Sequence, residues 1–188
     1  MAKSEHILYF LAILPSESIR KEVTGIKEYF REKYQTKAAL RSPAHITLHM
    51  PFRWKTKKEA ILHDVLAEFA LTVPVFDVQI DGYGSFAPRV IYLDIPDNPA
   101  MSRAQKTLVT TVRTRLNILN ANYKDRAFRP HMTVAFRDLR KADFYAAWED
   151  VKDKAIEYRF EANALTLLRN TGGKWDIYRN YPFSPGQK

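Results

Sequence analysis

A chain of 188 residues with 46% hydrophobic and 13% aromatic residues has enough apolar surface to bury a core, which excludes an intrinsically disordered chain. It contains no cysteine, so disulfides, thiolate metal ligands and a cysteine nucleophile are excluded, and a cytoplasmic location is expected. The net charge of +9, from 30 basic and 21 acidic residues, favours an anionic partner, although many soluble proteins are basic without binding one.

The apolar run at residues 7–14 near the start of the chain has two interpretations. Lys3 followed by this run resembles a short signal peptide, but no small-residue cleavage site follows it. The run is also far too short to span a bilayer. We therefore predict a buried first strand at residues 7–14 and no insertion into a membrane.

The remaining elements follow from the spacing of apolar residues between turn signals. Further strands are expected at residues 45–50, 75–80, 90–95, 131–136, 158–168 and 175–181. Helices, in which apolar residues recur every three or four positions, are expected at residues 16–34, 56–69, 98–119 and 141–151. Ser16 and Asn98 can cap two of these helices. The pattern strand, helix, strand, strand recurs, which predicts an α+β or α/β fold with duplicated units in a single domain, residues 1–188.

One short motif occurs twice, as HITL at residues 45–48 and HMTV at residues 131–134. On a strand, side chains alternate between the two faces, so the histidine and threonine of each motif point the same way while the apolar residues enter the core. A single His-x-Thr tripeptide occurs often by chance and is usually structural. Two copies, each preceded by a proline in similar surroundings, predict a functional site instead.

This set of side chains suits transfer at phosphorus without a metal or other cofactor. One neutral imidazole removes a proton from the attacking oxygen while the other, as imidazolium, protonates the leaving oxygen. Histidine fits both roles because its unperturbed pKa of about 6.5 lies near neutral pH. The threonine hydroxyls can donate hydrogen bonds to the non-bridging oxygens. The predicted catalytic residues are His45, Thr47, His131 and Thr133.

Side chains near the two motifs are weaker candidates for binding substrate. Arginine recognises phosphate through paired hydrogen bonds, and aromatic rings can stack on a nucleobase. The candidates are Arg129, Arg41, Arg53, Phe52, Arg89 and Phe86, and Arg137 also flanks the second motif. For each arginine a solvated surface position is the alternative, and for each aromatic residue a core position.

His49 lies four positions after His45 and is expected on the same strand face, at its rim or at the end of the strand. Two histidines on one face could bind a metal ion. A zinc site usually needs at least three protein ligands, however, and no acidic residue lies nearby in sequence. We therefore expect no metal site.

The two motifs resemble those of the two-histidine (2H) phosphoesterase superfamily, specifically its 2'-5' RNA ligase-like (LigT-like) family. Similarity extends over most of the chain, less specifically, at residues 9–15, 82–95, 128–136 and 165–183. The resemblance implies an α+β, bilobal fold with a pseudo-twofold axis, in which antiparallel sheets line a central cleft and each lobe contributes one motif. It also implies hydrolysis of 2',3'-cyclic phosphates to 2'-phosphates, cleavage of 2'-5' linkages, or 2'-5' joining of RNA ends.

Other functions stay open at this point. A module that binds nucleotide or RNA in the same cleft without chemistry is one alternative, although both histidines and both threonines are present. A metal-dependent hydrolase is another, and it would lose activity with a chelator. We expect a monomer that acts on RNA ends or small nucleotide phosphates, with His131 activating water and His45 protonating the leaving oxygen.

Overall fold

The computed structural model describes residues 6–119 and 127–186. The strands are β1 (His6–Ile13), β2 (Ile46–Lys55), β3 (Phe76–Asp81), β4 (Tyr83–Phe86), β5 (Val90–Asp94), β6 (His131–Ala135), β7 (Glu157–Ala162), β8 (Ala164–Thr171) and β9 (Lys174–Pro182). The helices are α1 (Glu17–Tyr34), α2 (Glu59–Leu71), α3 (Pro99–Leu116) and α4 (Lys141–Val151), with short 3-10 helices η1 (Ala38–Arg41) and η2 (Thr56–Lys58).

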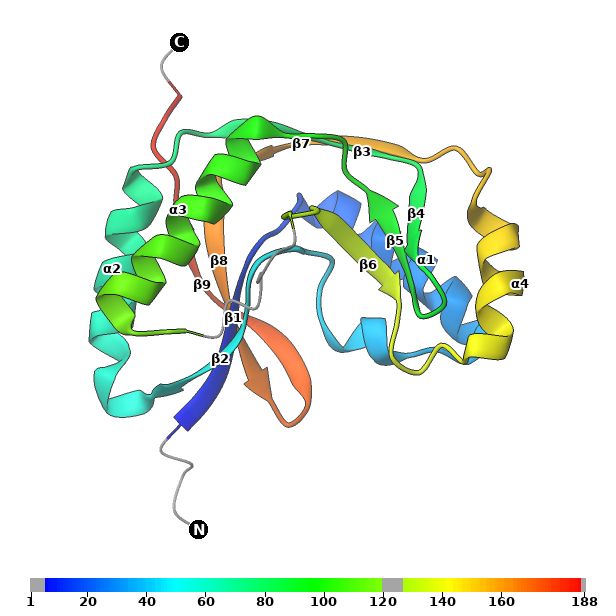
Figure 1. The fold of residues 1–188 in the computed structure, drawn as a ribbon, viewed down its shortest axis with the longest axis horizontal. Helices are drawn as coiled ribbons and strands as arrows, with labels where there is room; N and C mark the ends of the chain where they lie inside the picture. Colours follow the sequence, from blue (N-terminus) through cyan, green and yellow to red (C-terminus); the bar gives the residue numbers. More distant parts are fainter. Residues whose placement is uncertain (1–5, 120–126, 187–188) are drawn as a thin grey trace.

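The strands form three antiparallel sheets, and the predicted α+β class is confirmed. A four-stranded sheet has the order β2-β1-β8-β9, a three-stranded sheet has the order β4-β5-β6, and β3 pairs with β7 in a two-stranded ribbon. Figure 1 shows the four-stranded sheet with α2 and α3 in one lobe, and the three-stranded sheet with α1 and α4 in the other. The β3–β7 ribbon crosses above both lobes and connects them (Figure 1).

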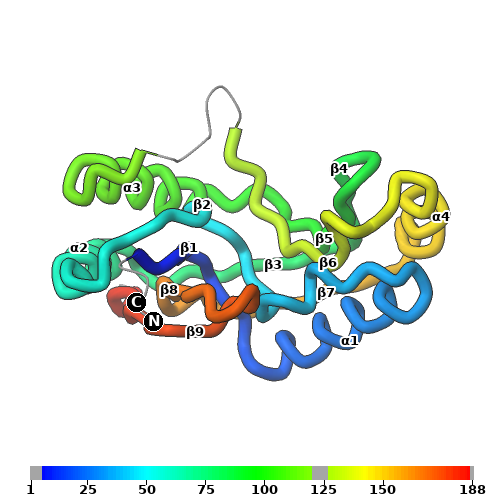
Figure 2. The backbone as a smooth tube through the Cα atoms, turned by 90° about the horizontal axis from the view of Figure 1, so that it is seen from below, coloured from blue at the N-terminus to red at the C-terminus, as the bar shows by residue number. Residues whose placement is uncertain are grey.

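Each lobe is completed by a helix from the other half of the repeat. Helix α1 follows β1 of the four-stranded sheet, yet it packs beside β6 and is tied to α4 by a 2.9 Å hydrogen bond from the Tyr29 hydroxyl to Asp150. Helix α3 follows β5 of the three-stranded sheet, yet it packs against α2 and β2. Figure 2 shows these two helices on opposite sides of the molecule. The predicted repeat is therefore present, but its halves interlock.

Strand β1 confirms the prediction of a buried first strand. Tyr9, Leu11 and Ile13 are fully buried in the main core. Phe10 and Ala12 are buried on the opposite face in a smaller cluster that includes Leu168. A strand covered on both faces reads as a continuous apolar run, which explains its likeness to a signal peptide. Within the described ranges, no helix is long and apolar enough to cross a membrane.

Several predicted boundaries are confirmed and others are wrong. The Ser16 hydroxyl accepts from the Ile19 amide at 3.4 Å, and the Asn98 side chain accepts from the Met101 amide at 2.9 Å, so both predicted caps form. Helix α3 ends at Leu116 rather than at residue 119, because Asn117 adopts a left-handed φ of 54°.

Two predicted strand assignments also need correction. The expected strand 158–168 is two strands, β7 and β8, which pair in different sheets. The expected loop between the strands at 75–80 and 90–95 contains the additional strand β4. Only Asn163 separates β7 from β8, and their partners β3 and β1 are distant in sequence, so local patterns could not divide them. Strand β4 contains Gly84 and follows Gly82, and glycine is typical of loops rather than strands.

Candidate active site

The first motif lies where the chain enters β2. Ile46 and Leu48 are fully buried in the core, and Thr47 is half-buried on the opposite face. The Nδ1 atom of His45 lies 2.7 Å from the carbonyl oxygen of Pro43, two residues earlier. The imidazole packs against the ring of Phe10, with 4.8 Å between ring centroids. A rigid strand and its preceding turn therefore fix the His45 ring.

The second motif repeats this arrangement at the start of β6. Met132 and Val134 are buried, and the Nδ1 atom of His131 lies 2.7 Å from the carbonyl oxygen of Arg129. The His131 ring packs against Tyr92 at 5.0 Å between centroids. Tyr92 on β5 is the direct neighbour of Thr133 in the sheet. The two motifs are therefore held in the same way by different sheets.

These hydrogen bonds define the state of both imidazoles. A carbonyl oxygen only accepts, so the Nδ1 atoms of His45 and His131 carry the hydrogen and each Nε2 keeps its lone pair in the neutral ring. Across residues 6–119 and 127–186, neither Nε2 atom and neither threonine hydroxyl, of Thr47 or Thr133, has a hydrogen-bond partner. Two bases and two donors are thus left available to a ligand.

The environment lowers the pKa of both histidines. For His45, burial is the main cause, the positive charges of Lys27 and His131 add to it, and the bond to Pro43 opposes it; the pKa falls to about 4. For His131, burial also lowers the pKa, opposed by the bond to the Arg129 carbonyl and by the negative charge of Asp94. Both rings are therefore neutral at pH 7.

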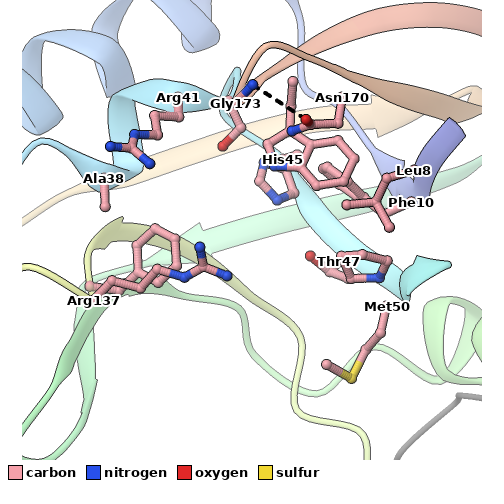
Figure 3. A pocket seen from close by; sticks show the side chains of 14 residues that line it. Leu8, Phe10, Ala38, Arg41, His45, Thr47, Met50, Arg137, Asn170 and Gly173 are labelled. Atoms are coloured by element: carbon pink, nitrogen blue, oxygen red, sulfur yellow. Dashed lines mark hydrogen bonds between the residues drawn. The ribbon is translucent and has the colours of Figure 1, made fainter. Parts of the chain in front are cut away.

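A cavity of about 430 Å³ opens at His45 and Thr47 (Figure 3). In Figure 3, Arg41 and Arg137 lie on one side of these two residues, and Leu8, Phe10 and Met50 lie on the other. The β8–β9 hairpin adds Asn170, Gly173 and Trp175 to the rim, and η1, β2 and the end of β6 complete the lining with Ala38, Ser42, Pro51 and Phe136. The cavity thus has a cationic side and an apolar side.

Asp138 joins the segment after β6, which carries Arg137, to the 3-10 helix η1, which carries Arg41. It follows Arg137, whose φ of 60° is left-handed, and its carboxylate accepts hydrogen bonds from the Thr36 hydroxyl at 2.6 Å and from the backbone amides of Lys37 at 3.0 Å and Ala38 at 3.2 Å. Burial raises the pKa of Asp138, but these hydrogen bonds outweigh it and the net shift is downward. The carboxylate thereby caps η1, which carries Arg41.

Only some of the weaker candidates for binding substrate lie at the cavity or beside a motif histidine. Arg41 lines the cavity, and Phe86 packs edge-on against His131 at 5.1 Å. Arg129 contributes its carbonyl to His131. Arg53 and Arg89 do not line the cavity; Arg89 lies in the β4–β5 turn, where its amide donates to the carbonyl of Phe86.

The prediction that Phe52 stacks on a base is wrong. Its side chain is 3% exposed and packs in the core against Tyr9, with 6.2 Å between ring centroids. Phe52 pairs directly with the buried Tyr9 in the β1–β2 ladder, and side chains of paired residues lie on the same face of the sheet.

The expectation that His49 shares a face with His45 is also wrong. The β1–β2 register is irregular on both sides of His49, which pairs with the core residue Leu11 whereas Thr47 pairs with Ala12 of the cleft face. This bulge buries His49 completely in the core, where its Nε2 atom has no hydrogen-bond partner among the described residues. The two-histidine metal arrangement considered above therefore does not form.

Burial of His49 predicts a loss of stability in acid. Burial lowers the pKa of His49 below its unfolded value of about 6.5. Below that pH the unfolded chain binds more protons than the folded one, so the folded state loses stability as the pH falls from about 6.5 toward the lowered pKa. We expect the free energy of unfolding, measured by urea denaturation, to decline from pH 7 to pH 5. The decline should be smaller in His49→Leu. Equal slopes in the two proteins would contradict this role.

Gly84 allows Tyr92 to pack against His131. A Cβ atom at Gly84 would overlap the Tyr92 ring and lie 2.8 Å from its hydroxyl oxygen. We expect Gly84→Ala to displace Tyr92 and to lower the catalytic rate by about ten- to a hundred-fold, because small misplacements of reacting groups are costly. Gly25→Ala is the matched control, since nothing lies within 4 Å of the added atom. Wild-type turnover in Gly84→Ala would show that Tyr92 does not position His131.

Several solved structures share this fold. The structure matches apo LigT of E. coli with a TM-score of 0.68 at 19% identity, covering 96% of this chain and 99% of LigT. TT0787 of Thermus thermophilus matches with a TM-score of 0.66 at 14% identity, covering 96% of this chain and 100% of that one. A protein described as a phosphoesterase matches with a TM-score of 0.66 at 18% identity, covering 96% and 99%.

The sequence itself gives the family. Residues 15–174 match the family described as the 2'-5' RNA ligase superfamily. The chain therefore belongs to this superfamily of 2H phosphoesterases, and the resemblance noted from the two motifs is confirmed. No curated protein sequence gives a significant match.

Proposed function

We propose that this protein is a metal-independent phosphoesterase that hydrolyses 2',3'-cyclic phosphates of RNA ends or nucleotides to 2'-phosphates, and that breaks or forms 2'-5' linkages at the same site. The observation that carries the proposal is the matched state of the two imidazoles. Each is fixed through Nδ1 by a carbonyl oxygen at 2.7 Å, which leaves Nε2 unpaired within the described chain.

The proposed hydrolysis exchanges one bond at phosphorus for another. A neutral imidazole takes a proton from water, and the water oxygen attacks phosphorus. The bond from phosphorus to the 3' oxygen breaks, and the second imidazole, protonated once the anionic substrate is bound, gives its proton to that oxygen. The product is the 2'-phosphate. In the joining direction the two histidines exchange roles, because each step is reversed.

The groups around the imidazoles suit the charge that develops during this reaction. Thr47 and Thr133 can donate to the non-bridging oxygens, on which charge accumulates in the transition state. Arg41 and Arg137 lie at the same cavity and have no carboxylate partner in the described ranges. Their guanidinium groups are free to bind phosphate oxygens in pairs.

The apolar side of the cavity suits a nucleobase. Trp175 packs edge-on against Phe10 at 4.6 Å between ring centroids, and both line the cavity next to His45. An exposed aromatic face stacks on any base without distinguishing its sequence. LigT of E. coli has been crystallised with 3'-AMP, ATP, NADP+ and phosphate, which supports a nucleotide-sized ligand for this chain as well.

We expect this protein to act as a cytoplasmic monomer.

The test is a substrate panel assayed with EDTA present. We expect nucleoside 2',3'-cyclic phosphates to give 2'-phosphates, and 2'-5' linked dinucleotides to be cleaved in preference to 3'-5' linked ones. Loss of activity on addition of EDTA would favour the metal-dependent alternative. Binding of adenosine 2'-phosphate without turnover of any substrate would favour the non-catalytic binding module.

A further inference from the structure

Lys27 is a buried lysine placed behind the first motif. Its side chain on α1 is 2% exposed, and its ammonium donates a 3.0 Å hydrogen bond to the carbonyl oxygen of Ser42. No carboxylate within residues 6–119 and 127–186 is paired with it. Burial lowers the pKa of Lys27 to about 8, so the group still carries its positive charge at pH 7.

The hydrogen bond of Lys27 acts on the turn that presents His45. Ser42 accepts from Lys27, and the next residue, Pro43, accepts from the imidazole Nδ1 of His45. The two carbonyls are consecutive in the chain, so fixing the first also restrains the second. A buried, otherwise unpaired ammonium is costly, and satisfying one carbonyl does not require a charge. Packing and the hydrogen bond to Ser42 therefore do not explain why a charged residue occupies this position.

The two motif histidines have similar hydrogen bonds but different charged neighbours. The charged groups that act on His45 are Lys27 on α1 and His131 on β6, and Arg41 and Arg137 line the same cavity. His131 instead lies directly opposite the carboxylate-bearing residue Asp94 in the β5–β6 ladder. Arg129, two residues before His131, is the cation on that side, and Asp94 raises the proton affinity of His131.

We propose that Lys27 is a positioning residue for the first motif: it fixes the Ser42–Pro43 turn that orients His45, and its positive charge acts on the His45 ring. The inference rests on the proposed two-histidine reaction and adds to it a residue that acts through His45. A cation beside an imidazolium weakens its hold on the proton, and a carboxylate beside an imidazole stabilises the imidazolium that forms.

The experiment compares Lys27→Met, Lys27→Gln and Lys27→Arg by NMR titration of the assigned histidine rings. We expect the pKa of His45 to rise by at least about half a pH unit in the Met and Gln variants and to stay low in the Arg variant, which keeps the charge. The pKa of His131 should move less than that of His45. Asp94→Asn is the reciprocal variant and should lower the pKa of His131 instead.

The titration does not depend on turnover, so it separates this inference from the proposed function. An unchanged His45 pKa in folded Lys27→Met and Lys27→Gln would overturn the role of the charge. Where the cyclic phosphate is hydrolysed, the limb of the rate profile that follows the pKa of His45 should move to higher pH in Lys27→Gln and stay in place in Lys27→Arg, because only the Gln variant loses the charge. Identical rate profiles in Lys27→Gln and Lys27→Arg would also overturn the role of the charge.

Discussion

Replacing either His45 or His131 by asparagine is expected to lower the hydrolysis of nucleoside 2',3'-cyclic phosphates by about a thousand-fold. Loss of a general acid or base typically costs about a hundred- to ten-thousand-fold. The asparagine amide can still donate to the carbonyl oxygen of Pro43 or Arg129, which keeps the turn in place, but it cannot exchange a proton near neutral pH. The measurement is the initial rate with EDTA present.

His63→Asn is the matched control for these two variants. His63 lies on α2, where its ring bonds to the Tyr181 hydroxyl and does not line the cavity. Its substitution should leave the rate within about two-fold of wild type, since surface and peripheral changes act mainly on stability. Near-normal turnover in folded His45→Asn or His131→Asn would remove the two-histidine mechanism.

Replacing Arg137 by methionine is expected to lower kcat/KM by at least about a hundred-fold, which is the usual cost of removing one preorganised donor to a developing anion. Arg137 lines the cavity on the side opposite Phe10 and Met50, and its left-handed φ of 60° shows that the chain accepts strain to hold it there (Figure 3). Lysine at this position should recover only part of the activity, because it lacks the paired donors of a guanidinium.

Arg89→Met provides the comparison for Arg137→Met. Arg89 lies in the β4–β5 turn and does not line the cavity, so the same change of charge there should alter kcat/KM by less than about three-fold at moderate salt. Equal losses in the two variants would indicate a general effect of net charge rather than a specific contact of Arg137 with the phosphate.

The placement of the two motifs on strands, with their apolar residues in the core, could be predicted from the sequence. A period of two places His and Thr on one face, and a second copy of the motif raises a weak pattern above chance. The alternation of faces did not predict the position of His49. A bulge in β2 inserts an extra residue, which moves the following side chains to the other face.

Other parts of the site depend on contacts that are distant in sequence. Trp175 reaches the cavity because β8 pairs with β1, and Asp138 caps η1 across about a hundred residues of chain. Nothing local to either residue indicates its partner. Lys27 is different, since it lies on the apolar stripe of the predicted helix, four positions after Val23 and three before Phe30. A lysine in the apolar stripe of a helix indicates a buried charge, so the position of Lys27 could have been predicted from the sequence.

The convergence of both imidazoles on one phosphate is the central claim, and NMR of the imidazole nitrogens tests it most directly. Adenosine 2'-phosphate is added to the full chain in the presence of EDTA while the Nε2 signals of the five histidines are followed. We expect the signals of His45 and His131 to shift together with one dissociation constant, and the buried His49 to stay unchanged. A response from only one of the two motif histidines, or from neither, would contradict a shared site.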